Sequence, residues 1–234
     1  MKLNTFIKTP YRKYRKFVLQ KQFKKTFESL CDNFDSIYDV DTEGLDANNY
    51  GAVRASVFDE IMKITSPLHK QQWFVDIGSG KGRALLLAAL RPFKKIIGIE
   101  IKYDYCRVAK ENIARASKRI PGTERIEIEC TDAFWWVSQH WPVHKEILFF
   151  MYHPFSSDTF KEVYFPYENF FGLLAENIKN SNNHVILAFV NPLSIHVNEG
   201  RLRDLGFLKI AENKQVYSDL SNQILSYKLF DCGC

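Results

Sequence analysis

Short apolar runs alternate with longer helical patterns along the chain from residue 72 onward. Apolar runs of strand length predict five strands, at residues 73–77, 95–100, 125–130, 146–152 and 184–190. The segments between them predict four helices, at residues 82–90, 102–118, 132–139 and 157–179, the last with a break at Pro166. This alternation predicts a parallel sheet with right-handed crossovers and helices on both faces.

The C-terminal part of the chain departs from this alternation. Residues 201–212 and then residues 222–230 suggest a helix followed by a closing antiparallel pair of strands. We therefore expect an α/β fold with a Rossmann-like, seven-stranded, mostly parallel sheet. In such sheets a ligand binds beyond the carboxyl ends of the strands, near the point where the strand order reverses.

The N-terminal part of the chain reads as a helical extension outside the alternating pattern. Residues 11–31 predict a helix with a single apolar stripe, formed by Leu19, Phe23, Phe27 and Leu30. Residues 32–50 are polar, acidic and rich in turn formers, so we expect a connecting loop there. A second helix is expected over residues 52–64.

The formal net charge of +5 is unevenly distributed along the chain. Residues 1–27 contain nine basic side chains and no acidic one, whereas the rest of the chain contains 23 basic and 27 acidic side chains. The basic segment would suit binding to phosphate or to an acidic macromolecule. It would equally suit the solvated face of a helix, because no aromatic side chain lies clearly on the charged side. Both interpretations stay open at this point.

Other features of the composition bear on the compartment and the chemistry. No apolar run approaches the ~18 residues that a membrane span needs, and the first residues lack the apolar core of a secretory signal, so we expect a cytoplasmic protein. The cysteines are irregularly spaced, so we expect free thiols in a reducing compartment; they are Cys31, Cys106, Cys130, Cys232 and Cys234. The six histidines are scattered without metal-binding spacing, so no metal is expected.

A glycine-rich stretch, FVDIGSGKGRALLLAAL at residues 74–90, joins the first expected strand to the helix that follows it. Its glycines Gly78, Gly80 and Gly82 are spaced G-x-G-x-G. The spacing differs from the G-x-G-x-x-G of dinucleotide sites, which disfavours a nicotinamide-dependent oxidoreductase, and the chain contains no P-loop motif. Missing side chains still allow a ligand to lie directly on the backbone. The stretch therefore favours a ligand that is not held by its phosphates.

Acidic residues lie at or just after the ends of the first three expected strands. The negative charge of Asp76 would repel a diphosphate but attract a cationic ligand. Glu100 ends the second strand, where a carboxylate can accept both hydroxyls of an unphosphorylated ribose. Asp132 is placed either to bind an adenine amino group, with Phe134 or Trp135 against the ring, or only to cap the next helix. A ligand with these groups is S-adenosylmethionine, which carries an ammonium and a sulfonium.

The ordered set D-I-G-S-G-K-G-R, G-I-E and T-D-A-F resembles the cofactor motifs of class I S-adenosylmethionine-dependent methyltransferases, over roughly residues 50–190. The chain is most similar to a largely uncharacterised bacterial group that carries F-D-x-x-Y-G-V-D-T and [YF]-N-P-F motifs. These motifs are matched here by residues 34–42 and 152–155. Asp39 and His153 depart from them, since glycine and asparagine are usual at these positions.

A weaker likeness joins residues 49–62 to the Y-G-E segment of non-SET histone-lysine methyltransferases, which helps to close over the cofactor. The resemblance divides the chain into a basic N-terminal extension with a cofactor-covering segment, residues 1–66, and an S-adenosylmethionine-binding methyltransferase domain, residues 67–234. It implies that the cofactor is bound by Tyr50, Asp76, Gly78, Ser79, Gly80, Gly82, Glu100, Asp132 and Ala133.

The resemblance also implies methyl transfer to a nitrogen or oxygen nucleophile. Residues 152–155 follow the central strand, nearest the reacting methyl, so we expect Tyr152 and His153 to be the catalytic residues. His153 would accept a proton from the nucleophile, or would only hydrogen-bond the loop backbone. A protein lysine, or another acceptor on a protein or nucleic acid, would account for the basic N-terminal segment. The alternatives are a small-molecule acceptor, with the N-terminal helix as a lid or membrane-surface contact, and a non-catalytic cofactor-binding module.

Overall fold

The structure is a computed structural model of the whole chain. It describes residues 34–35, 38–41, 52–65, 73–143, 145–152, 154–155, 165–181, 183–190, 199–213 and 227–232. The expected N-terminal helix over residues 11–31 lies outside these residues, as does most of the expected loop over residues 32–50. The boundary expected between residues 66 and 67 lies outside them too, so the division of the chain into two parts stays a prediction.

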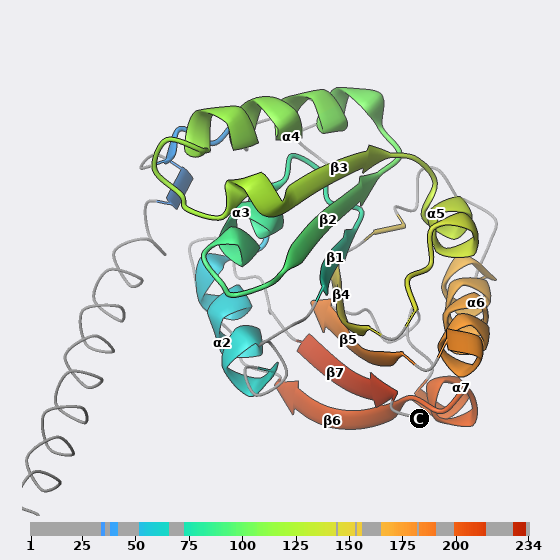
Figure 1. Cartoon of the computed structure of the whole chain (residues 1–234). Coiled ribbons are helices and arrows are strands. Elements are labelled where there is room, and N and C mark those ends of the chain that lie inside the picture. The colour runs from blue at the N-terminus through green and yellow to red at the C-terminus, as the bar shows by residue number, and fades with distance from the viewer. Residues whose placement is uncertain are drawn as a thin grey trace, which may run out of the picture.

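A seven-stranded sheet forms the centre of the fold, in the order β3-β2-β1-β4-β5-β7-β6 (Figure 1). The five expected strands are parallel; they are β1 (Trp73–Ile77), β2 (Lys95–Glu100), β3 (Ile126–Cys130), β4 (Glu146–Tyr152) and β5 (His184–Val190). The sheet is closed by an antiparallel pair, β6 (Leu208–Asn213) and β7 (Tyr227–Cys232), with β7 beside β5. The expected Rossmann-like, mostly parallel sheet is therefore confirmed. The strand order reverses between β1 and β4.

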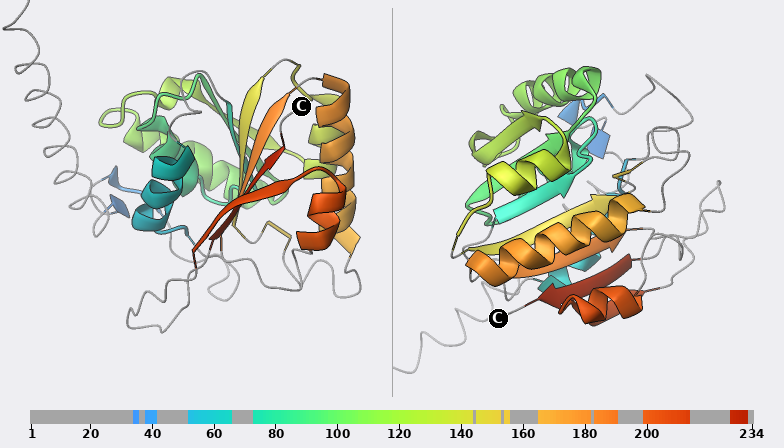
Figure 2. Two further views of the ribbon diagram at one scale, coloured as in Figure 1. Left: turned by 90° about the horizontal axis from the view of Figure 1, so that it is seen from below. Right: turned by 90° about the vertical axis from the view of Figure 1, so that its right-hand side faces the viewer.

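Helices cover both faces of this sheet (Figure 2). One face carries α2 (Ala55–Thr65), α3 (Arg83–Ala89) and α4 (Tyr103–Ala116), while the other carries α5 (Ala133–Gln139), α6 (Phe165–Ser181) and α7 (Glu199–Asp204). A short 3-10 helix, η2 (Thr123–Arg125), precedes β3. Both layers bury apolar side chains against the sheet, and this explains why the central strands read as continuous apolar runs.

Alternate side chains of the central strands enter two separate cores. Phe74 and Phe150 pack on the α2 side, where the Phe58 ring lies 5.7 and 5.5 Å from theirs. Val75 and Phe149, one residue away on the same strands, pack on the α6 side. Helix α2 thus packs directly against the sheet.

Two later segments were also expected from the sequence. Helix α6 contains most of the helix expected over residues 157–179, while residues 157–164 lie outside the described residues, so the expected break at Pro166 stays a prediction. The expected C-terminal helix followed by an antiparallel pair of strands is confirmed, since α7 ends at Asp204 and β6 starts at Leu208. Gly206, at a φ of +93°, allows this change of direction. Within the described part of the chain, no helix has the length and apolarity of a membrane span.

Candidate functional site

The glycine loop (residues 78–82) leads from the end of β1 into α3, at the point where the strand order reverses. The amides of Gly78 and Ser79 both donate to the Ile99 carbonyl of β2, at 2.9 and 3.0 Å. The buried Ser79 hydroxyl is directed at Gly98, where an added Cβ would lie 2.8 Å from it. The loop is therefore held against β2.

Two glycines of this loop are required by their surroundings. Gly78 has a φ of +72°, and a Cβ there would lie 2.7 Å from the Pro154 Cα. The segment after β4 therefore touches the glycine loop directly. Gly82 has a φ of +83°, and a Cβ there would lie 3.2 Å from the Ala109 Cβ of α4. Both positions combine a left-handed backbone with close packing, which only glycine accepts without strain.

Two buried carboxylates lie at the carboxyl ends of neighbouring strands beside this loop. Asp76 of β1 is 4% exposed and Glu100 of β2 is 7% exposed. Burial raises the pKa of Asp76 well above its ordinary value of 3.8, and the negative charge of Glu100 raises it further. Two like charges that disfavour each other in a buried site favour a positively charged ligand between or beside them.

Glu100 connects the glycine loop to the start of α4. Its Oε2 accepts the Gly80 amide at 2.9 Å, and its Oε1 accepts the Lys102 amide at 2.9 Å. A carboxylate has about four lone-pair sites, so each oxygen can still accept a ligand hydroxyl. The carboxylate is thus held in a fixed orientation at the place where a ribose is expected.

Asp132 and Ala133 lie at the start of α5, after β3. The Asp132 side chain accepts the Trp135 amide at 3.0 Å, so it caps the helix, as one of the two interpretations expected. Trp135 itself is 51% exposed. Its neighbour Phe134 packs inward, with its ring 5.4 Å from that of Phe170. Contact of Asp132, Ala133 or Phe134 with an adenine stays a prediction.

Tyr152 ends β4, close to the residues that precede α2. Burial raises the pKa of its phenol, while the nearby positive charge of Arg54 partly opposes this shift. Tyr152 is therefore protonated near neutral pH and acts as a hydrogen-bonding group. The Val53 carbonyl accepts a hydrogen bond from Arg83 of α3, so the segment before α2 is bonded to the helix that follows the glycine loop.

Phe155 fixes the segment that follows β4. Its ring lies 4.9 Å from that of Tyr167, 5.6 Å from that of Phe170 and 5.9 Å from that of Phe134. Burial raises the pKa of Tyr167 to about 12, although a hydrogen bond with the Phe155 backbone partly lowers it. This aromatic cluster joins α5, α6 and the segment after β4, so it fills space that would otherwise be open to solvent.

Two expected site residues, Tyr50 and His153, lie outside the described residues, and their roles stay predictions. Two others were not expected from the sequence. Ile101 directly follows Glu100 and is 62% exposed, which would allow it to cover an apolar ligand ring. The sequence did contain a signal for Ile101, because an apolar residue directly follows the acidic residue that ends β2. Arg54 had no such signal, because only the fold brings it near Tyr152.

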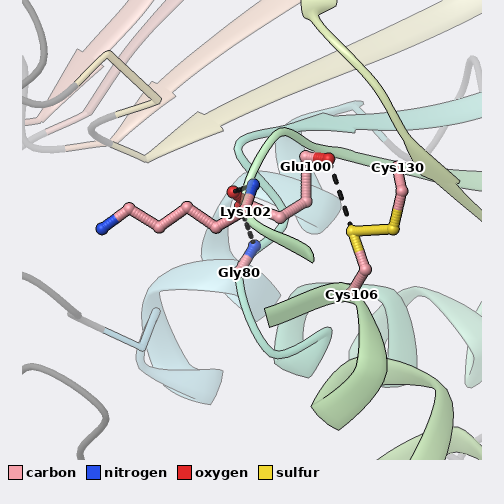
Figure 3. The surroundings of a disulfide bond; sticks show 5 residues. All are labelled: Gly80, Glu100, Lys102, Cys106 and Cys130. Carbon is pink, nitrogen blue, oxygen red and sulfur yellow. Dashed lines mark hydrogen bonds between the residues drawn. A yellow bond between two sulfur atoms is a disulfide. The ribbon is translucent and has the colours of Figure 1, made fainter. Parts of the chain in front are cut away.

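Cys106 and Cys130 form a disulfide beside Glu100 (Figure 3). Cys106 lies in the first turn of α4, and Cys130 ends β3 as the register partner of Glu100. Their Cα atoms are 6.0 Å apart, and the Cys106 Sγ lies 3.4 Å from the Glu100 carbonyl oxygen. The expectation of free thiols is therefore wrong for this pair, because the crossover helix returns the chain to the same sheet edge. The Cys232 side chain is buried, and Cys31 and Cys234 lie outside the described residues.

The basic side chains in and just after the glycine loop pair with acidic side chains of the same chain. The Lys81 side chain is 1% exposed and pairs with Asp41, while Arg83, at the start of α3, pairs with Asp35. Over the described ranges, no group of three histidine, cysteine, aspartate or glutamate side chains is placed to hold a metal ion. Bare backbone, fixed carboxylates and an exposed apolar residue fit a cationic nucleoside with a free ribose.

Residues 42–131, fewer than half of the 234 in the chain, match the family model described as histone methylation protein DOT1. This match includes the glycine loop, Glu100 and Cys130. No curated protein sequence matches the chain.

Solved structures of methyltransferases share the fold. An S-adenosylmethionine-dependent O-methyltransferase from Thermotoga maritima matches with a TM-score of 0.57 and 15% identity, over 80% of this chain and 68% of that one. A precorrin-6y C5,15-methyltransferase from Geobacter metallireducens matches with a TM-score of 0.53 and 14% identity, over 83% and 100%. A putative methyltransferase from Escherichia coli matches with a TM-score of 0.51 and 11% identity, over 76% and 87%. The chain has the fold of class I S-adenosylmethionine-dependent methyltransferases, and the resemblance seen in the sequence is confirmed at this level.

Proposed function

We propose that this protein binds S-adenosylmethionine and transfers its methyl group to a nitrogen or oxygen nucleophile. The observation that carries the proposal is the buried pair Asp76 and Glu100 beside the glycine loop. A buried pair of carboxylates is costly without a positive partner, and the donor brings two positive groups. The match of residues 42–131 to the DOT1 model and the shared methyltransferase fold support the same conclusion.

The chain's own residues would bind and orient the donor. The glycine loop provides backbone on which the methionyl part can lie, Asp76 provides negative charge for the ammonium, and Glu100 accepts the ribose hydroxyls. Asp132 and Ala133 would bind the adenine edge, with Ile101 over the ring. When bound, S-adenosylmethionine supplies an electrophilic methyl group on a positively charged sulfur. The protein's main task is then to align the nucleophile about 3 Å from that methyl and to exclude water.

The nucleophile would approach from the segment after β4. Tyr152 ends this strand as a neutral phenol and can orient the acceptor by hydrogen bonding. His153 is proposed to accept the proton that the nucleophile releases. Pro154, in contact with Gly78, and Phe155, packed among aromatic rings, would hold both residues beside the donor.

For the acceptor, we propose a lysine on a protein, bound through the basic N-terminal segment. Residues 1–27 carry nine basic side chains and no acidic one, which suits an acidic macromolecular surface. The partial match to a histone methylation family supports the same class of acceptor. We propose a cytoplasmic location for this reaction.

The test is transfer of a labelled methyl group from S-adenosylmethionine to protein, RNA and small-molecule fractions of a cell extract. We expect label in protein, at lysine by mass spectrometry, and slower labelling when Lys21, Lys24 and Lys25 are changed to glutamine in the full chain. Label found only in the small-molecule fraction would contradict the proposed protein acceptor, but it would still support methyltransferase activity. Binding of the donor without transfer to any fraction would favour a non-catalytic module, and no binding would overturn the proposed function.

The raised pKa of Asp76 predicts how donor binding depends on pH. As the pH rises from 3.8, the ordinary value, through the raised pKa, the free protein gains a buried negative charge that the unfolded chain already carries in water. The free energy of unfolding therefore decreases across this window. A bound cation offsets that charge, so the affinity for S-adenosylmethionine should increase across the same window and then level off. Calorimetry over this pH range measures the profile.

Asp76→Asn is the control for this prediction, because the amide keeps the size of the side chain and removes its titration. Its affinity should be weaker at high pH and nearly independent of pH across the window. A wild-type affinity that is flat or that falls with rising pH would contradict the assigned role of Asp76.

A further inference from the structure

An N-terminal clip, defined as residues 34–35 and 38–41, lies against the glycine loop and α4. Phe34 is 1% exposed and Val40 is 7% exposed, so the clip is anchored by apolar side chains in the core on the α2 side. The Val40 amide donates to the Asp35 carbonyl at 2.8 Å, which closes the clip on itself. Asp39 has a φ of +55°, which explains why glycine is usual at this position in similar sequences.

Asn112 of α4 joins the clip to the glycine loop. Its side chain is completely buried. The Asp41 amide donates to the Asn112 Oδ1 at 2.9 Å, and the Asn112 Nδ2 donates back to the Asp41 carbonyl at 3.1 Å. The same Nδ2 donates to the Lys81 carbonyl at 2.9 Å. One side-chain amide therefore bonds to two chain segments that are 40 residues apart.

Charged contacts support the same arrangement. The buried Lys81 ammonium lies 3.3 Å from the Asp41 Oδ1. Arg83, just after the loop, lies 2.8 Å from the Asp35 Oδ1, and its guanidinium is 5.6 Å from the Phe34 ring centroid. Arg115 donates to the Asn112 Oδ1 at 2.6 Å. The positive charges of the K-G-R sequence therefore bind the acids of the clip.

The Lys81 carbonyl, which accepts the hydrogen bond from Asn112, is close in the chain to the Gly80 amide, which belongs to the ligand site. Lys81 directly follows Gly80, and the Gly80 amide donates to the Glu100 Oε2. A shift of the Lys81 peptide would change the position of the Gly80 amide and, with it, the orientation of the Glu100 carboxylate. Asn112 belongs to none of the residues expected to bind the donor, yet its bond to Lys81 acts on the loop that does.

We propose that Asn112 is a positioning residue that holds the glycine loop in its ligand-binding shape by bonding it to the N-terminal clip. The proposal rests on the proposed function, since it concerns the affinity of the same site for S-adenosylmethionine. The clip would then influence cofactor binding without touching the cofactor, because it helps to hold the glycine loop in place. Docking of the clip and binding of the cofactor then favour each other by the same factor.

The test is the dissociation constant of S-adenosylmethionine, measured by calorimetry on the full chain with Asn112→Ala. We expect it to rise by about 5- to 50-fold, which is within the range of a typical coupling between two sites. Asn183→Ala is the matched control. Asn183 is 1% exposed, its Oδ1 accepts the Lys145 amide at 2.7 Å and its Nδ2 donates to the Pro142 carbonyl at 2.7 Å, at the opposite end of the sheet. The control should lower the unfolding temperature similarly and leave the dissociation constant unchanged.

A second variant, Asp41→Pro, keeps Asn112 in place and removes both groups by which Asp41 reaches Asn112 and Lys81, the backbone amide and the carboxylate. It decides the question if Asn112→Ala does not fold, and we expect it to weaken binding by a similar factor. Unchanged affinity in a folded Asn112→Ala or Asp41→Pro variant would overturn the inference and leave the proposed function intact. An equal loss of affinity in Asn112→Ala and Asn183→Ala would overturn it too, since the loss of folding stability alone would then explain the weaker binding. Failure of the wild-type chain to bind the donor would refute the proposed function instead.

Discussion

Glu100→Gln is expected to weaken binding of S-adenosylmethionine about 100-fold, the equivalent of one or two charge-assisted hydrogen bonds. Both carboxylate oxygens already accept backbone amides, one from Gly80 and one from Lys102. The NH2 group of glutamine is a hydrogen-bond donor, and it would face one of these two backbone amides, which are donors too. The variant therefore loses acceptors for the ribose and also disturbs the glycine loop. Calorimetric titration of wild type and variant with the same donor measures the difference.

Glu127→Gln is the control for this prediction. Glu127 lies on the neighbouring strand β3, is 52% exposed and pairs with Lys95. Removing an exposed pair of this kind has little effect on stability, so affinity and unfolding temperature should both stay close to wild type. An affinity of Glu100→Gln within twofold of wild type would show that the ribose is bound elsewhere.

Gly78→Ala is expected to lower the free energy of unfolding by about 3 kcal/mol and to slow methyl transfer about 100-fold. The new Cβ would lie 2.7 Å from the Pro154 Cα, and the φ of +72° already disfavours a side chain. Because the nearest atom belongs to the backbone, the loop and the segment after β4 must separate. Donor and acceptor would then no longer be aligned. Chemical denaturation and single-turnover transfer measure the two effects.

The matched control is Gly172→Ala, in the interior of α6. A Cβ at this position meets no atom within 4 Å, and its φ is not positive. The same chemical change should therefore stabilise the protein by about 0.5–1 kcal/mol and leave transfer unchanged. If Gly78→Ala behaved like Gly172→Ala, the contact between the glycine loop and Pro154 would not matter for the reaction.

The sequence by itself determined the sheet and its helices. Runs such as EILFFMY, now β4, are apolar on both faces, because a central parallel strand is covered by helices on both sides. It also placed Asp76, Glu100 and Asp132 at one edge, since the carboxyl ends of parallel strands meet there. The glycine spacing and the acids were enough to distinguish a cationic nucleoside from a diphosphate ligand. These features are local or periodic, so they can be read along the chain.

The tertiary structure alone decided which distant residues meet. Nothing in the spacing of Asp41, Lys81 and Asn112 indicates that one buried amide bonds to the other two. The disulfide between Cys106 and Cys130 likewise depends on how α4 returns the chain to β3. Contacts of this kind depend on the packing of whole elements, whose relative positions are set by burial over the entire core rather than by any local pattern.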